Sequence, residues 1–361
     1  MSIPKVGIIY LAFPTKNWQR DMDRALRSFE SIDYPRESLE LILIEPEKTS
    51  PRVKEWFDAN WAQSPKLPRV HYIFNRDENI GFAENNNVGL QKARELGCDY
   101  IHLTNEDTDV DSSYLKYAVE CAESDAKIGA VQSLILLGDD RERINSSGNS
   151  FHFLGFGYSN DYRVDRSHAK TGEIGYASGA ATLVRVSALG NRPLFDKKLF
   201  MYHEDTDLSL DLKSRGYKIV VEPRSIVWHY YEFGKNKINY CWMERNRWVL
   251  ILSYYRLWTL FLVAPIAFVM DVALSLFAIK NGWFDMKWKQ IKEWLDPAFW
   301  RWIRARRRMI ASSRTVGDRE LLRLAVADIR FQEEHVRNPV LEYIGNPVMR
   351  FYWAVIRQLI I

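Results

Sequence analysis

Cysteine is scarce in this sequence, with three in 361 residues at positions 98, 121 and 241. Their number is odd and their spacing is not that of a metal site, which predicts core packing in a reducing compartment. The opening residues, MSIPKVGIIYLAF, lack the basic segment and long apolar core of a secretory signal, so we expect none.

Two nucleotide-binding motifs are also missing. No G-x-G-x-x-G follows the first apolar run, which argues against a dinucleotide oxidoreductase. No G-x-x-x-x-G-K-[ST] occurs, which argues against a P-loop NTPase. The net charge of +4 is too small to indicate a class of partner. It is unevenly distributed, however, because residues 287–314 hold nine Lys or Arg and only two acidic residues.

The first two hundred residues do show an alternation of apolar runs and segments with helical spacing, the pattern of a parallel α/β sheet. Unbroken runs such as VGIIYL predict strands buried on both faces. We expect strands at 6–11, 39–44, 70–74, 100–103 and 128–136, and helices at 18–32, 53–61, 82–96 and 114–122. Residues 138–173 are expected to form a long loop or hairpin. Ligands of such sheets bind at the carboxyl ends of the strands.

Three polar clusters are predicted to lie there. Glu45 ends the second strand. The sequence TNEDTDVD follows the strand at 100–103, and it is either an acidic turn or an oxygen-ligand site for Mg²⁺ or Mn²⁺. The sequence NIGFAENNNVG places Gly81 at a helix start with Asn85, Asn86 and Asn87 on the first turns. These amides either cap the helix or reach a base, ribose or phosphate.

Two further segments contribute candidates. The small residues of 177–181, including Ser178 and Gly179, would let a ligand approach the backbone closely. Glu204 and Asp205 open a predicted helix that ends at Gly216, and helix capping alone could explain an acidic residue there. Strands are expected at 218–222, closed by Pro223, and at 226–230, which carries His229 as either a packed strand residue or a metal ligand.

Together these segments resemble the inverting family-two glycosyltransferases, in particular rhamnosyltransferase- and galactofuranosyltransferase-like members. The matching segments are 79–89, the triplet Asn105–Asp107, 177–185 and 200–229. The resemblance implies a GT-A fold, a Rossmann-like mixed α/β sheet flanked by helices, with a nucleotide-sugar donor half at 1–110 and an acceptor half at 111–235. A helical, membrane-associated region is expected at 236–361.

The resemblance also implies roles for residues. Asp205 would be the general base, with Glu204 beside it, and Asp107 and His229 would bind a divalent metal, Mg²⁺ or Mn²⁺, with Asp109 as a helper. The expected donor-binding residues are Glu45, Asn79, Gly81, Asn85, Asn86, Asn105, Glu106, Ser178 and Gly179. This chain departs from the family at Asn105, where many relatives carry Asp, and at Glu45–Pro46, which replaces an Asp-rich turn that holds the base.

Residues 257–279 form an apolar run of 23 residues, long enough to span a bilayer but interrupted by Pro265 and Asp271. Trp and Lys/Arg interleave over 283–308, which is typical of an interfacial helix on anionic lipid. A single span would place this basic segment opposite the catalytic domain, so we expect an in-plane or re-entrant hairpin on the cytoplasmic face, with membrane contact over 256–310. A core helix of a soluble domain is the alternative.

The remaining expectations concern partners. Basic and aromatic residues also suit nucleic acid, but no RNA-binding motif is present, so we expect no nucleic-acid partner. An amphipathic helix is predicted at 318–334, and the apolar tail at 348–361 either anchors the chain or buries against a neighbouring subunit of a homo-oligomer. The acceptor is expected to be a lipid-linked or cell-surface glycan. The rival is a non-catalytic nucleotide- or sugar-binding subunit of a membrane glycan-assembly complex.

Overall fold

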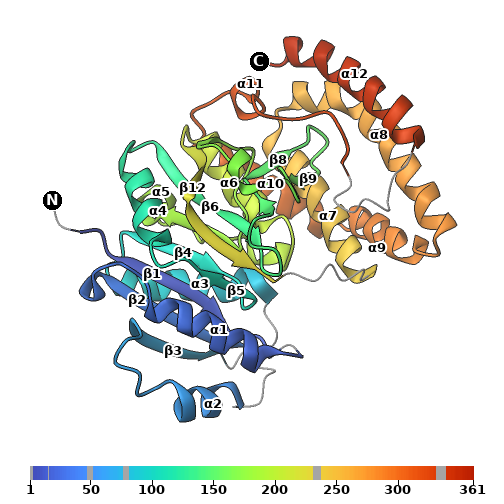
Figure 1. The fold of residues 1–361 in the computed structure, drawn as a ribbon. Coiled ribbons are helices and arrows are strands. Elements are labelled where there is room, and N and C mark those ends of the chain that lie inside the picture. The colour runs from blue at the N-terminus through green and yellow to red at the C-terminus, as the bar shows by residue number, and fades with distance from the viewer. Residues whose placement is uncertain (1–2, 15, 47–51, 76–80, 231–236, 331–338) are drawn as a thin grey trace. The chain divides into compact units, whose positions relative to one another are not determined.

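A computed structural model gives the fold and describes residues 3–14, 16–46, 52–75, 81–230, 237–330 and 339–361 (Figure 1). The chain divides into two compact units. The first comprises residues 1–149, 159–212 and 217–232, and the second comprises 150–158, 213–216 and 233–361. The domain limits expected from the sequence, 1–235 and 236–361, stay a prediction. Each unit is described by itself below.

The first unit is built on a ten-stranded mixed sheet with the order β10-β12-β6-β11-β4-β1-β2-β3, in which β5 pairs with β12 and β7 with β6. The strands are β1 (Val6–Leu11), β2 (Leu39–Pro46), β3 (Arg69–Asn75), β4 (Tyr100–Thr104), β5 (Thr108–Val110), β6 (Ile128–Leu137), β7 (Ile144–Ser146), β10 (Gly172–Glu173), β11 (Ala181–Arg185) and β12 (Lys218–His229). Strands β1 to β4 are parallel to their neighbours in that group, whereas β11 runs antiparallel between β4 and β6.

Helices cover both faces of this sheet, as alternate residues of β1 show. Ile8 and Tyr10 pack with α1, α2 and α4, whereas Ile9 and Leu11 pack with α3, α5 and α6. The helices are α1 (Trp18–Glu30), α2 (Arg52–Asn60), α3 (Gly81–Glu95), α4 (Tyr114–Glu123), α5 (Val186–Leu189) and α6 (Glu204–Ser214). Short 3₁₀ turns lie at Arg36–Ser38, Arg166–His168 and Lys197–Leu199. The strands and helices expected over the first 136 residues are therefore present, with bounds shifted by a few residues.

One expectation for this unit was wrong. The predicted break at Pro223 does not end a strand, because β12 runs on to His229 with a bulge between Glu222 and Ile226. A bulge is where a strand tolerates a proline, which has no N–H to donate to the ladder.

The range 138–173 was expected to form a long loop or hairpin. In the first unit, β7 and β10 of this range join the main sheet. Strands β8 (Asn149–Phe151) and β9 (Gly157–Ser159) pair with each other in a two-stranded sheet, most of which belongs to the second unit.

The second unit is helical. Its helices are α7 (Lys237–Tyr254), α8 (Leu257–Lys280), α9 (Phe284–Leu295), α10 (Pro297–Ala311), α11 (Asp318–Leu321) and α12 (Asn346–Leu359), with a π-helical turn at Leu341–Gly345. The amphipathic helix expected at 318–334 was wrong, since α11 ends at Leu321 and residues 322–330 form no helix. Helices α8 and α12 lie side by side (Figure 1), and the Tyr352 hydroxyl donates to the Leu262 carbonyl at 2.7 Å.

Helix α8 is long and apolar enough to cross a membrane, with a mean hydropathy of 2.3 over its most apolar stretch. Only 11% of that stretch is buried, and the buried positions Thr259, Val263 and Ala267 follow one another at helical spacing. The other faces expose large apolar side chains such as Phe261 and Phe268. Within the described residues of the second unit, α8 therefore buries one stripe and leaves its other apolar side chains exposed.

Asp271, the acidic residue within the apolar helix α8, forms its ion pair inside the second unit. Lys287 Nζ of α9 lies 2.5 Å from Asp271 Oδ1, and Trp248 of α7 donates its indole N–H to the same oxygen at 3.3 Å. Arg247 is fully buried and forms a two-bond pair with Glu244. Lys287 is 1% exposed, so the expectation that it belongs to a lipid-facing basic surface was wrong. Its amine is required to balance a carboxylate on an otherwise apolar helix.

Candidate functional site

Strand pairing brings Asp107 and His229 together at the carboxyl end of the sheet. After β4 the chain turns through residues 105–107 and returns as β5, which pairs with the end of β12 so that Thr108 faces His229. The Thr108 hydroxyl donates to the Asn105 carbonyl at 2.8 Å, and the Tyr230 N–H donates to the Asp107 carbonyl at 2.9 Å. As a result, His229 Nε2 lies 3.1 Å from Asp107 Oδ1.

The two acidic residues of this turn differ in charge state. Burial alone would raise the pKa of Asp107, but the adjacent His229 imidazole outweighs it and lowers that pKa below its usual value. Burial, with a further contribution from the Asp107 charge, raises the pKa of Glu106 to about 7. Asp107 is therefore the ionised member of the pair at neutral pH.

The residues present fit a metal ion in part. In the part of the chain that the structure describes, no group of three or more His, Cys, Asp or Glu side chains is placed to hold one. Asp107 and His229 meet, but Asp109 accepts from Arg141 at 3.0 Å and does not join them as a third ligand. Two protein ligands are compatible with Mg²⁺, which commonly keeps several waters and takes other ligands from substrate phosphates.

Asp205 is fixed at the start of α6 by two backbone donors. Thr206 N–H donates to its Oδ1 at 2.6 Å and Gly179 N–H donates to its Oδ2 at 3.2 Å. Burial raises the pKa of Asp205 against the lowering effect of these hydrogen bonds. Burial and the Asp205 charge raise the pKa of Glu204 as well, and Glu204 Oε2 has no hydrogen-bond partner among the described residues. A carboxylate with a raised pKa is a better proton acceptor than an ordinary aspartate.

Three segments distant in sequence meet around Asp205. A Cβ added to Gly179 would lie 3.7 Å from both Asp205 and Phe82, so the loop at 177–180 touches the starts of α6 and α3. Gly81 has φ +78°, and a Cβ there would come within 2.5 Å of the Phe200 ring. The Ala83 N–H donates to the Phe200 carbonyl at 3.2 Å. The start of α3 and the chain leading into Asp205 are thus locked together.

The expected donor-binding amides are placed differently from what the sequence suggested. Asn85 and Asn86 are buried and donate back into α3, to the carbonyls of Gly81 and Phe82 at 2.8 and 3.0 Å. Glu45 is also fully buried and accepts from the Tyr72 hydroxyl. Direct contact of these three side chains with a donor stays a prediction. Asn79 lies outside the described residues.

Two structural residues of the site were missed by the sequence analysis. Gln132 is fully buried on β6, and its Oε1 accepts from Ser178 N–H at 2.9 Å, which fixes the loop at 177–180. Phe200 has φ +65° and packs against Gly81. A buried glutamine in an otherwise apolar strand was a visible signal. Nothing local marks Phe200, because its partner is over a hundred residues away.

The register of the sheet places the Asp107–His229 pair and the loop at 177–180, which holds Asp205, at the same end of the strands. Ala181 faces Thr104 of β4 and Thr182 faces Gln132 of β6. The loop at 177–180 therefore precedes β11 where β4 gives way to the Asn105–Asp107 turn. Asp107 and His229 are brought into contact, and Asp205 is held beside that loop by Gly179.

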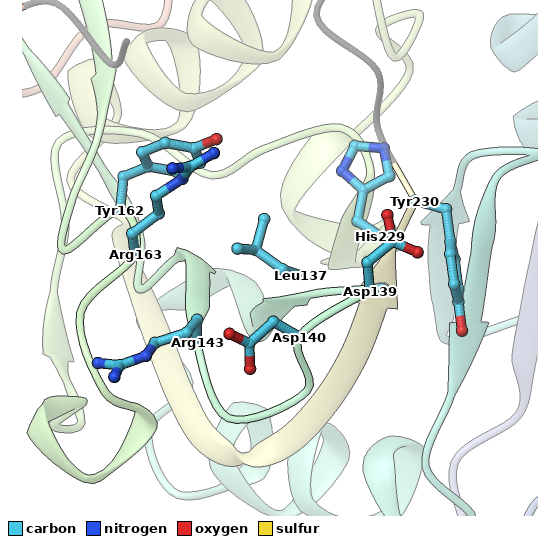
Figure 2. Close-up of a pocket in the computed structure, with 9 residues that line it drawn as sticks. Leu137, Asp139, Asp140, Arg143, Tyr162, Arg163, His229 and Tyr230 are labelled. Atoms are coloured by element: carbon cyan, nitrogen blue, oxygen red, sulfur yellow. The ribbon is translucent and has the colours of Figure 1, made fainter. Parts of the chain in front are cut away.

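An open pocket of about 460 Å³ adjoins His229. Figure 2 shows Tyr162, Arg163 and Arg143 on one side of this pocket and His229 and Asp139 on the other, with Leu137 and Asp140 between them. Its volume is within the usual range for small-molecule sites. Carboxylates, guanidinium groups and tyrosine rings around one cavity suit a polar ligand with many hydroxyl groups.

Comparison with known proteins gives a consistent result. The family model described as "Glycosyltransferase like family 2" matches residues 7–250, which is more than half of the chain. Poly-beta-1,6-N-acetyl-D-glucosamine synthase of Staphylococcus aureus (strain COL) is 31% identical over 176 residues, 47% of this chain and 38% of that protein. The match thus spans well under half of that relative's length.

Two further similarities agree with this. N-acetylglucosaminyl-diphospho-decaprenol L-rhamnosyltransferase of Mycobacterium tuberculosis (strain CDC 1551 / Oshkosh) is 39% identical over 69 residues, 19% of this chain and 22% of that protein. The crystal structure of GalNAc-T7 with UDP, GalNAc and Mn²⁺ matches with a TM-score of 0.53 and 17% identity, over 69% of this chain and 50% of that one. This likeness concerns the fold, and the expected GT-A fold is confirmed.

Proposed function

The chain belongs to the glycosyltransferase-like family 2, and from this premise we propose that it moves a sugar from a nucleotide-sugar donor to a glycan acceptor with inversion at the anomeric carbon. One observation carries the proposal. The Asp205 carboxylate is held by the Gly179 and Thr206 amides beside the start of α3, with a pKa raised by burial.

In this mechanism Asp205 is the general base. Its carboxylate accepts the proton of the acceptor hydroxyl as that oxygen attacks the anomeric carbon and the bond to the diphosphate breaks. The Gly179 and Thr206 N–H groups keep the carboxylate in one orientation, so the proton acceptor is in place before the acceptor arrives. Burial and the Asp205 charge raise the pKa of Glu204, so Glu204 holds its own proton more readily and leaves Asp205 as the proton acceptor of the pair.

Asp107 and His229 would hold a divalent ion, Mg²⁺ or Mn²⁺, with the donor diphosphate and water completing its ligands. Such an ion offsets the negative charge that develops on the leaving diphosphate. Within the protein, His229 and the Tyr230 N–H fix the position of Asp107 from two sides. The half-buried turn at 105–107 would therefore present a preorganised carboxylate to the ion.

We expect the acceptor to be a lipid-linked or cell-surface glycan whose attacking hydroxyl reaches Asp205. The support is the names of the two relatives, which refer to a polysaccharide and a lipid-diphosphate sugar. We also propose attachment to the cytoplasmic face of a membrane in an in-plane arrangement. The exposed apolar side chains of α8 support the contact with a membrane.

The test is Asp205→Asn, with Asp211→Asn on the same helix as the matched control, because Asp211 pairs with Arg192 away from the loop at 177–180. A positioned base contributes about 10²–10⁴-fold in rate, so Asp205→Asn should lower transfer by that factor and leave donor binding intact. Donor binding is measured by thermal shift with nucleotide sugars and Mn²⁺, and transfer by release of nucleoside diphosphate. A wild-type chain that binds the donor but transfers to no glycan would instead be a non-catalytic binding subunit.

A further inference from the structure

A second pocket, of about 350 Å³, lies in the helical unit and is unusually rich in arginine. Four of its lining residues are arginines, namely Arg256, Arg307, Arg308 and Arg314, and none of the lining residues is acidic. The nearest carboxylate with a defined role is Asp318, which is fully buried and already accepts from Arg314 and from the backbone N–H of Arg256. The cavity therefore concentrates positive charge.

Arg307 and Arg314 are held by hydrogen bonds within the protein, whereas Arg256 and Arg308 could bind a ligand. Arg307 donates through Nη1 to the carbonyls of Leu252 and Tyr255 at 2.6 and 2.8 Å, and Arg314 donates to the carbonyl of Tyr254 at 2.7 Å. Burial lowers the pKa of Arg307, and the nearby Arg314 adds to this effect. The guanidinium groups of Arg256 and Arg308 are exposed and have no ion pair or hydrogen bond with the described residues.

The start of α8 adds to the positive potential. Arg256 occupies the N-cap position, and its side chain makes no capping hydrogen bond. The first N–H groups of a 24-residue helix thus open beside the arginines, and this end of a helix attracts anions. On its own a helix start would indicate nothing, but here it coincides with a cavity lined by four guanidinium groups.

Exposed apolar side chains lie close in sequence to two of the pocket's arginines, Arg256 and Arg308. Leu257 follows Arg256 directly and is 76% exposed, and Phe261 is 69% exposed one turn further along α8. Met309, next to Arg308 on α10, is exposed as well. A free phosphate ion would need only the arginines, whereas a basic cavity with exposed hydrocarbon close by matches a molecule that joins a phosphate to a lipid chain.

We propose that this pocket, at the N-terminal end of α8, binds the phosphate group of a membrane lipid. Each arginine guanidinium can donate two parallel hydrogen bonds to phosphate oxygens. The exposed apolar side chains near Arg256 and Arg308 would contact the acyl or prenyl chain. The phosphate belongs either to bulk anionic phospholipid or to a polyprenyl diphosphate. The inference rests on the membrane attachment included in the proposed function, but not on sugar transfer.

The experiment is vesicle flotation of the full chain. Three vesicle types are compared: phosphatidylcholine alone, phosphatidylcholine with phosphatidylglycerol, and phosphatidylcholine with a small amount of polyprenyl diphosphate. The test variant is Arg256→Gln with Arg308→Gln. The matched control is Arg301→Gln with Arg304→Gln, which removes the same charge from exposed positions of α10 outside the pocket.

Each arginine removed, in either variant, reduces the general electrostatic attraction to anionic vesicles and should weaken vesicle binding by about fivefold. The pocket variant should lose about tenfold or more beyond this, because it also loses charge-assisted hydrogen bonds to phosphate. Replacing Arg256 and Arg308 by Lys keeps the charge but removes the planar guanidinium groups. Vesicle binding should therefore be only partly restored relative to the double Gln variant. The vesicle type that shows this difference identifies the lipid.

Equal losses in the pocket and control variants, or full recovery with lysine, would overturn the pocket while leaving membrane attachment standing. A wild-type chain that floats with none of the vesicles would remove the attachment itself. Neither result bears on the Asp205 test, which is read from donor binding and sugar transfer. Circular dichroism of both double variants checks that the helical unit remains folded.

Discussion

The junction between Gly81 and Phe200 gives a quantitative test of how the site is built. Gly81 and Gly97 both have positive φ, +78° and +70°, but a Cβ at Gly81 would lie 2.5 Å from the Phe200 ring and 2.8 Å from its carbonyl oxygen, whereas a Cβ at Gly97 has no heavy atom within 4 Å. Alanine at either position carries the left-handed cost of about 1–2 kcal/mol. Only Gly81→Ala adds overpacking, which costs about 1–3 kcal/mol.

The free energy of unfolding should therefore fall by about 1–3 kcal/mol more in Gly81→Ala than in Gly97→Ala. Urea titration of both variants followed by tryptophan fluorescence measures this difference. Gly81→Ala should also slow sugar transfer by on the order of 10²-fold, because displacing Phe200 moves the chain that leads into Asp205. Gly97→Ala should leave transfer unchanged.

A second substitution isolates the contact. Phe200→Ala in the Gly81→Ala background removes the ring that the new Cβ meets, so part of the additional stability loss should be recovered, and a double-mutant cycle measures that coupling. Equal stability losses at Gly81 and Gly97, or the absence of coupling with Phe200, would refute the packing of α3 against this segment.

Three further predictions concern buried charge. Burial lowers the pKa of His102 in the folded chain to about 3, whereas a histidine in the unfolded chain has a pKa of about 6.5. As the pH falls below about 6.5, the unfolded chain therefore binds a proton that the folded chain does not, and the free energy of unfolding decreases. His102→Leu should abolish about 2–3 kcal/mol of the loss between pH 6.5 and 4.5 in urea titrations, whereas the exposed His168→Leu should not. The raised pKa of Glu204 means that its ionisation costs stability as the pH rises, so Glu204→Gln should melt higher than wild type at pH 8 and show little gain at pH 4. Lys287→Met should destabilise the second unit by up to about 3 kcal/mol, because Asp271 loses its nearest cation and keeps only the more distant Arg247 and the Trp248 indole N–H among the contacts described above, and adding Asp271→Leu should restore thermal stability.

The sheet of the first unit was predictable because its strands are short apolar runs and its helices carry one buried stripe. Val6–Leu11 has no polar residue and is buried throughout, so its sequence alone identified it. Pro223 was misread because local rules end a strand at proline, whereas pairing of β12 with β6 on both sides of the bulge keeps one strand. The helix expected at 318–334 ends at Leu321 for a related reason, since Val326 exchanges backbone hydrogen bonds with Phe151 and Phe153 instead of continuing the helix.

The roles of Asp107, Asp205 and His229 were expected from the family resemblance and stay a prediction, whereas their contacts could not be read from the sequence. That Gln132 accepts from Ser178 N–H, and that Arg141 pairs with Asp109, depends on side chains brought together only by the folded sheet. Asn85 and Asn86 show the reverse case, since amides that suggested ligand contact satisfy carbonyls of their own helix.

The pairing of Asp271 with Lys287 makes α8 dependent on the next helix of the chain. A shortened protein that stops at Asn281 would keep the apolar helix but lose the Lys287 amine, while Arg247 at 4.0 Å and the Trp248 indole N–H of α7 would remain beside the Asp271 carboxylate. Excising α8 alone would remove these groups as well and leave a carboxylate on an apolar helix. Helix α8 should therefore be easier to graft or express by itself when Asp271 is replaced by an apolar residue of similar size.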